Sequence, residues 1–148
     1  MIALLLMVLL SLLGVTLLTV ASTEHSIAFN ALWLEGAISA ADAGVNRGIN
    51  QLTANATNSL AAFGPTAIPA GGTYSFRSGP KTATGAQPLT YVGSRVEQGY
   101  NMAVGTGYNQ GGFVFHVYQI NATGTGPTGP RAAQREVELR AEYGPVAQ

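Results

Sequence analysis

Residues 1–23 read MIALLLMVLLSLLGVTLLTVAST and contain no charged side chain; the first one is Glu24. An α-helix rises about 1.5 Å per residue, so about twenty apolar residues match the roughly 30 Å hydrocarbon thickness of a bilayer. No proline occurs before Pro65, and a helical pattern continues to about Leu52. The sequence therefore predicts one helix over about residues 1–52, apolar in its first half and amphipathic in its second.

The composition excludes several classes of protein. The 148 residues include seven basic and seven acidic side chains, nineteen glycines, seven prolines and no cysteine. Without cysteine there can be no disulfide and no thiolate metal site. The scattered cations do not form the basic face that neutralises phosphates, so nucleic acid is not expected as the main partner. The part of the chain after the helix is long enough for one small domain.

The apolar start has three interpretations. A cleaved secretory signal would begin with basic residues and have an apolar core of about 7–15 residues, whereas no Lys or Arg precedes this longer run. A single-pass membrane anchor fits the length but lacks the basic flanks that normally set orientation. The favoured interpretation is a helix that assembles with other copies, and with it we expect Met1 to follow a removed basic leader.

The second half of the helix is expected to pack on another layer. Apolar or small residues recur at alternating steps of four and three, which place them on one side of a helix. The predicted helix–sheet packing residues are Ile27, Ala31, Leu34, Ile38, Ala41, Val45 and Leu52. Gly36, Gly44 and Gly48 each cost about 1 kcal/mol relative to alanine in a helix. They therefore indicate that another element approaches the helix closely.

The rest of the chain predicts a sheet. Candidate strands lie at 73–77, 89–96, 100–104, 112–121 and 133–143, with glycine- and proline-rich loops at 64–72 and 122–132. The candidate at 112–121 carries aromatic and β-branched residues on both faces, so we expect it to be central. The last candidate alternates, with apolar residues inward and charged residues outward. Its expected inward residues are Val137, Leu139, Ala141 and Tyr143.

Together these elements predict an α+β fold. One long N-terminal helix, about 1–52, packs its C-terminal half on an antiparallel sheet of about four strands. We divide the chain into an apolar half of the helix (1–23), an amphipathic half (24–53) and a sheet domain (54–148).

The sequence offers little that points to catalysis. The segment 124–129 matches G-x-G-x-x-G, but a strand is expected after it where a nucleotide site needs a helix N-terminus, so a turn is predicted. His25 and His116 lack neighbours that could complete a metal site, and each is expected to be a satisfied structural histidine. No catalytic residue, cofactor or metal is predicted, and we expect that the chain is not an enzyme.

Three acidic residues share one side of the predicted helix: Glu24, Glu35 and Asp42. Their steps of eleven and seven residues separate them by many ångströms along the axis, too far for joint acid–base chemistry. They are interpreted as a solvated face or a face between subunits. Phe29 and Trp33, four residues apart, are interpreted as packing or interface residues.

Several segments are similar to one known family. They are LLGV at 12–15, IAFN at 27–30, AADAGV at 40–45, INQL at 49–52 and YQINATGTGPTGPR at 118–131. Together with the apolar and amphipathic helix halves and the C-terminal sheet, they resemble the type IV pilin superfamily. The segments themselves are similar in sequence to its PilX-like minor pilin branch. Gly14 lies where mature pilins commonly carry a glycine that loosens the helix.

The resemblance implies a structural subunit of a type IV pilus-like extracellular filament. The implied partners are copies of itself or other pilins in a helical filament, and the inner membrane before assembly. The implied assembly residues are Met1, Leu5, Leu9, Leu13, Gly14 and Leu17. The alternatives are a minor pilin or type II secretion pseudopilin at a filament tip, or a membrane-anchored surface binding module.

Leu5 departs from the family pattern. Pilins usually carry glutamate at the fifth mature position, where it pairs with the N-terminal amine of a neighbouring subunit. An ammonium buried without a partner is costly. The departure therefore implies either that methylation and local carbonyls compensate, or that this subunit occupies a position, such as the tip, where the pairing is not needed.

Overall fold

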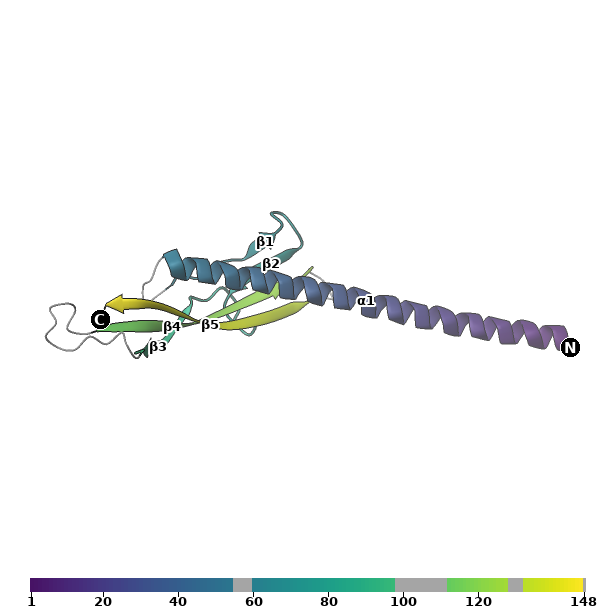
Figure 1. Cartoon of the computed structure of the whole chain (residues 1–148). Helices are drawn as coiled ribbons and strands as arrows, with labels where there is room; N and C mark the ends of the chain where they lie inside the picture. Colours follow the sequence, from purple (N-terminus) through teal and green to yellow (C-terminus); the bar gives the residue numbers. More distant parts are fainter. Residues whose placement is uncertain (55–59, 98–111, 128–131, 148) are drawn as a thin grey trace.

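A computed structural model describes residues 1–54, 60–97, 112–127 and 132–147 (Figure 1). One helix precedes a sheet, so the predicted α+β class is confirmed. The elements are α1 (Ile2–Ala54), β1 (Thr66–Ile68), β2 (Tyr74–Ser78), β3 (Thr90–Arg95), β4 (Phe113–Thr125) and β5 (Gln134–Ala147). The predicted strand at 100–104 lies outside the described residues. Figure 1 shows the sheet beside the C-terminal half of α1, while the N-terminal half projects away from it.

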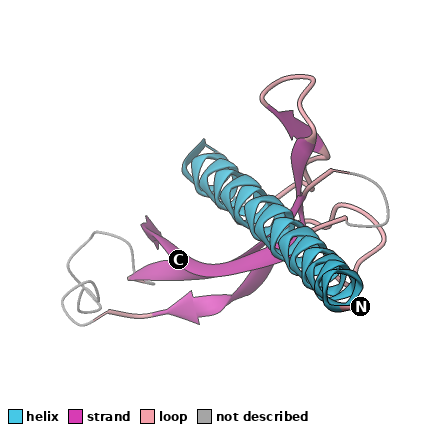
Figure 2. Ribbon diagram, turned by 90° about the vertical axis from the view of Figure 1, so that its right-hand side faces the viewer, coloured by secondary structure: helices cyan, strands magenta, loops and turns pink. Residues whose placement is uncertain are grey.

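β4 is the central strand, as predicted. All strand pairs are antiparallel, and β4 pairs with β5 along nearly its whole length. Its other pairings are with β2 and β3, and β1 extends the sheet beyond β2. Figure 2 shows α1 crossing the sheet, with the β1–β2 hairpin rising beside it.

The sheet is larger than predicted in two places. β4 continues to Thr125, so the first four residues of the loop expected at 122–132 are strand, and β5 continues to Ala147. The additional β4 residues Ala122, Thr123 and Gly124 are buried. Ala122 and Gly124 are small and lie under α1, whereas the Thr123 hydroxyl donates to the Gly79 carbonyl. β1 was missed, since only three residues separate Pro65 from Pro69 and both prolines are typical of a loop.

Small residues on both surfaces bring α1 close to β4. The buried positions of the helix are Ala37, Ala40, Ala41, Gly44, Val45, Gly48 and Leu52. A Cβ added to Gly48 would lie 2.6 Å from Cγ2 of Ile120, and one added to Gly44 would lie 2.9 Å from Cβ of Ala122. The packing thus explains why glycine is kept in a helix despite its cost in propensity.

The predicted packing stripe needs correction at its N-terminal end. Ala41, Val45 and Leu52 are buried and Leu34 is half-buried. Ile27 and Ile38 are 67% and 44% exposed, and Ala31 is also exposed, so these three do not pack on the sheet. The physical reason is that the sheet covers only the C-terminal part of α1 and contacts the side formed by alanines and glycines, whereas Ile27 and Ile38 lie off that side.

The hydrophobic core lies between the end of α1 and the sheet. It consists of Leu52, Leu60, Phe63, Phe76, Leu89, Tyr118 and Ile120. The rings of Phe63 and Phe76 pack edge to face with centroids 6.1 Å apart. From β5, Ala141 and Tyr143 are only partly buried against this core, and Leu139 is 36% exposed. The inward face predicted for β5 is therefore the face toward the core, but it is covered incompletely.

Ser78 joins three segments through one buried hydroxyl. Its Oγ accepts a hydrogen bond from the Phe63 N–H at 2.9 Å and lies 2.5 Å from the Gln87 carbonyl oxygen, to which it donates. The side chain has no exposed surface. The hydroxyl therefore stabilises the return of the chain from α1 to the sheet and the loop that leads to β3.

Replacing this hydroxyl is expected to destabilise the sheet domain. Ser78→Ala leaves the Phe63 N–H and the Gln87 carbonyl without this partner, which should lower the free energy of unfolding by about 1–3 kcal/mol. Chemical denaturation followed by near-UV circular dichroism measures the change. Ser75→Ala, on the same strand but half-buried, is the control; equal losses in both variants would contradict the role given to Ser78.

Candidate functional site

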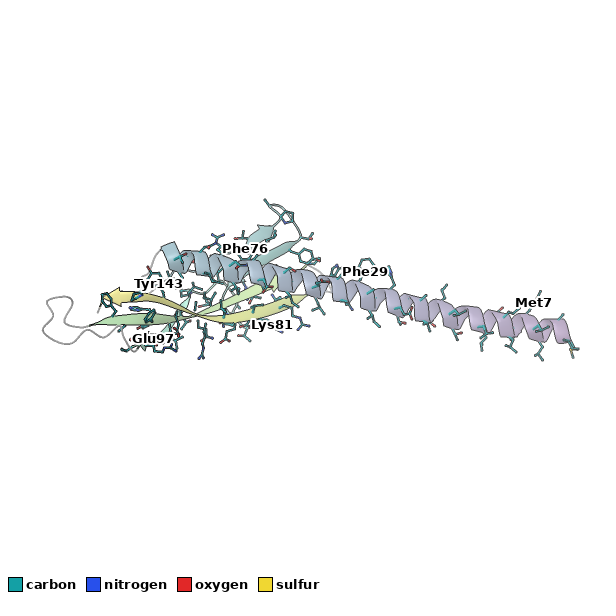
Figure 3. All side chains as sticks on the ribbon, viewed as in Figure 1. Met7, Phe29, Phe76, Lys81, Glu97 and Tyr143 are labelled. Carbon is teal, nitrogen blue, oxygen red and sulfur yellow. The ribbon has the colours of Figure 1, made fainter. Side chains whose placement is uncertain are left out.

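The apolar half of α1 is uncovered in the single chain. Each of its residues is exposed, and Figure 3 shows side chains around the projecting helix, with Met7 labelled. Its large apolar side chains are between 51% and 106% exposed. They are Met1, Ile2, Leu4, Leu5, Leu6, Met7, Val8, Leu9, Leu10, Leu12, Leu13, Val15, Leu17, Leu18 and Val20. An apolar surface of this extent, uncovered by its own chain, marks an interaction site.

The hydroxyl groups within the apolar half are satisfied by the helix itself. Ser11 donates to the Met7 carbonyl at 2.8 Å, and Thr16 donates to the Leu13 carbonyl at 2.8 Å. Thr19 and Thr23 make the same kind of bond to carbonyls three residues earlier, both at 2.7 Å. Such back-bonding removes the need for water. These hydroxyls are therefore compatible with a surface that enters an apolar environment.

All six predicted assembly residues lie on this uncovered surface. Gly14 differs from the glycines of the second half, since a Cβ added to it would meet nothing within 4 Å. α1 runs through Gly14 without a break. Packing inside the chain therefore gives no reason for a glycine here. Helix loosening at Gly14 in an assembled state stays a prediction.

Aromatic rings follow one another where α1 reaches the sheet. His25 and Phe29 pack edge to face with centroids 4.6 Å apart, and Phe29 and Trp33 with centroids 6.2 Å apart. Figure 3 places Phe29 near the point where the helix leaves the sheet. Phe29 is 39% exposed and Trp33 is half-buried. The rings thus form a transition between the covered and uncovered parts of the helix.

The three helix carboxylates are exposed and take part in none of the ion pairs found in the described ranges. The ion pairs there join Arg95 to Glu97 and Arg95 to Glu142, both at the surface of the sheet. Within residues 1–54, 60–97, 112–127 and 132–147, no three His, Asp or Glu side chains are placed to hold a metal ion. The three helix carboxylates therefore form a solvated surface in the single chain.

A groove lies between α1 and the β1–β2 hairpin. Its volume is about 190 Å³, and it is lined by Gly36, Ser39, Ala40, Ala43, Ile68 and Tyr74. We call it the hairpin groove. None of its lining residues is charged. The sequence did not predict it because β1 was missed, although the small residues between Gly36 and Ala43 signalled a close approach to this side of the helix.

His116 is less satisfied than expected. Its ring lies among aromatic rings, 5.4 Å from Tyr91 and 6.4 Å from Tyr118 between centroids. Its buried Nδ1 has no hydrogen-bond partner among the described residues, which corrects the expectation of a satisfied structural histidine. Packing against aromatic rings accounts for its position in the sheet.

Burial raises the pKa of Tyr118 above its ordinary value of 10.0, and the neighbouring Tyr91 and Tyr143 raise it further. The folded state therefore keeps the phenol proton at a pH where the unfolded chain releases it. The stability that the protonated Tyr118 phenol contributes is therefore present below about pH 10 and is lost as the pH rises through the folded-state pKa.

Denaturation at several pH values above 9 should show that Tyr118→Phe loses less stability with rising pH than the wild type does. Identical losses would contradict this assignment.

The structure describes residues 124–127 of the G-x-G-x-x-G segment, and this part begins in the sheet. β4 includes Gly124 and Thr125, and the N–H of Gly126 donates to the Ala133 carbonyl at 2.7 Å. β5 follows from Gln134. The next element that the structure describes is therefore a strand, and no helix N-terminus of the kind that a pyrophosphate site requires follows among residues 132–147.

α1 is the one helix in the described chain that is long and apolar enough to cross a membrane, and none of its apolar window is buried. A signal sequence near an N-terminus passes the same test of length and composition. No family model, no curated protein and no solved structure matches this chain. The uncovered helix and its junction with the sheet are therefore the features that indicate a function.

Proposed function

We propose that this chain is a structural subunit of a type IV pilus-like extracellular filament, and that its activity is assembly without catalysis. The apolar half first anchors the subunit in the inner membrane. On assembly the same helix leaves the lipid and joins a bundle of sister helices. The bundle and the lipid are similarly apolar, so transfer between them gains far less free energy than burial from water. A motor must therefore drive assembly, and the cost of exposing the helix to water then holds the filament together.

One observation carries the proposal: α1 is continuous from Ile2 to Ala54, yet only its C-terminal part is covered. The buried alanines and glycines hold the helix on β4, so the sheet domain can form without the apolar half. The apolar half is then available to lipid or to other copies. Its hydroxyl groups donate to carbonyls of the same helix, so they are compatible with both environments.

Removal of residues 1–24 tests the proposal. The fragment 25–148 retains the whole contact between α1 and the sheet, so we expect a folded, soluble monomer by sedimentation and circular dichroism. The full chain, by contrast, should require detergent or form assemblies. If the fragment formed filaments like those of the full chain, the apolar half would not be the assembly element.

A membrane-anchored surface binding module is the second candidate, because the same helix meets the requirements for a single span. In that case the apolar half would stay in the bilayer, and the loops of the sheet domain would bind the ligand. The two functions differ in location. Material sheared from the cell surface should contain the chain if it forms filaments, whereas an anchored module should stay with the membranes.

If the chain is a filament subunit, its position can be at the tip or along the whole filament. The uncovered surface contains Leu5 and no carboxylate before Glu24. An apolar half without a carboxylate that could pair with a neighbour's amine fits a tip position, as in a minor pilin or a type II secretion pseudopilin. Incorporation along the whole filament, seen by immunogold labelling, would argue instead for a major subunit.

A further inference from the structure

We propose that the hairpin groove receives the apolar half of α1 from a second copy of this chain. The inference rests on the proposed function and deepens it, because it names the surface that a neighbouring helix contacts. Three observations support it: the shape of the groove, its lack of charge, and the area that the apolar half presents.

The groove is shaped to receive a large apolar side chain. Its helical wall consists of Gly36, Ser39, Ala40 and Ala43, and its opposite wall of Ile68 and Tyr74. An apolar cavity of about 150 Å³ is enough to bind benzene, and this groove has about 190 Å³. Ser39 and Ala43, small residues of this wall that keep exposed surface, also allow another helix to approach closely. The Tyr74 ring lies directly against Gly36, so the walls meet there. A leucine side chain from such a helix would therefore enter the part of the groove beside Ser39, Ala43 and Ile68.

The electrostatics of the groove match the proposed occupant. The lining residues are uncharged, and no residue of 1–23 has a charged side chain. The nearest carboxylates on the helix, Glu35 and Asp42, each precede a lining residue by one position. Glu35 and Asp42 are also four residues before and three residues after Ser39, so both exposed carboxylates flank the rim of the groove at Ser39. An apolar side chain can therefore enter the groove without burying a charge.

The area of the apolar half is sufficient for stable contacts between copies. A large apolar side chain offers on the order of 100 Å² of surface when it is fully exposed. The fifteen side chains named above are 51–106% exposed, so together they present on the order of 1,000 Å², and a stable interface needs about 800 Å² per partner. The chain supplies an apolar helix and a groove for it, so a second copy is the occupant to which we commit.

Photo-crosslinking tests the contact directly. The chain has no cysteine, so Ser39→Cys in the full chain provides a single thiol at the exposed rim of the groove for a benzophenone maleimide. After detergent removal and irradiation, mass spectrometry should locate the adduct on residues 2–23 of a second, isotopically labelled copy. Adducts confined to lipid, to the same chain, or to another segment of the second copy would overturn the inference.

Filling the groove tests its contribution to assembly. Ser39→Phe should lower the pelletable fraction of the full chain about tenfold after detergent removal. Ile38→Phe is the control, because Ile38 is exposed at nearly the same position along the helix axis but points to another side of α1. It should change the fraction less than twofold, and both variants should keep the thermal unfolding of the wild type.

The outcomes separate this inference from the proposed function. If the wild type assembles and the two phenylalanine variants behave alike, the groove is not the contact and the proposed function stands. If the wild-type chain forms no assemblies under any condition that removes detergent, the proposed function and this inference both fail.

Discussion

Gly124→Ala is expected to lower the free energy of unfolding by about 3 kcal/mol or more. Gly124 lies in β4 beneath α1, and its added Cβ would lie 2.6 Å from the Ala41 nitrogen and 3.0 Å from the Ala37 carbonyl carbon. Both are backbone atoms of a helix, which cannot move aside as a flexible side chain can. Overpacking of a core typically costs about 1–3 kcal/mol and occasionally more, and this site belongs at the upper end.

Gly126→Ala is the matched control for this prediction. Gly126 is two residues further along and is also buried, but its added Cβ would meet its nearest atom, the Cβ of Ala133, at 3.4 Å. We expect a change below about 1 kcal/mol, since that contact is close to ordinary van der Waals distance. Chemical denaturation of both variants measures the difference. Similar stabilities would contradict the close approach of α1 to β4.

Leu12→Lys is expected to reduce membrane association of the full chain by a few hundredfold. Leu12 is near the middle of the apolar half and is 67% exposed in the single chain. Lysine in place of leucine at the centre of a membrane helix costs about 3–4 kcal/mol, and each 1.4 kcal/mol corresponds to about tenfold. Flotation with lipid vesicles measures the bound fraction.

Two controls make this second prediction specific. Thr23→Lys places the same charge at the end of the apolar half, where its long side chain reaches the headgroups, so flotation should change little. Thermal unfolding of the sheet domain should be unchanged in both variants, because the apolar half contacts no part of the sheet. A loss of binding with Thr23→Lys equal to that with Leu12→Lys would contradict a membrane boundary near Glu24.

The long helix was the most predictable part of the fold. The expected helix over 1–52 corresponds to α1 at Ile2–Ala54, because residues 1–53 lack proline and keep a helical period. The central strand was also predictable from its aromatic and β-branched residues. Both signals are local, so they do not depend on what the rest of the chain does.

The packing face of α1 was harder to predict for a physical reason. Helical periodicity identified a stripe that includes Ile27 and Ile38, but periodicity cannot show how far the sheet extends along the helix. The contact also depends on close backbone approach, for which alanine and glycine matter more than isoleucine. Gly44 and Gly48 pointed to that approach, and their positions give the covered side of the helix better than the large apolar residues do.

The hairpin groove depended on an element that the sequence did not reveal. Its outer wall comes from Ile68 and Tyr74, and Ile68 belongs to a three-residue strand between two prolines. Such a strand forms because β2 offers an edge with which to pair, which is a tertiary effect. A surface formed between a helix and a hairpin therefore becomes visible only when the chain is folded.

Cryo-electron microscopy of material sheared from the cell surface tests the central claim most directly. The claim is that the uncovered apolar half of α1 is an assembly element. We predict helical filaments that contain this chain, with residues 2–23 of many copies bundled at the axis and the sheet domains outside. Sheared material without such filaments, together with full-length chain retained in the membrane fraction, would contradict the claim.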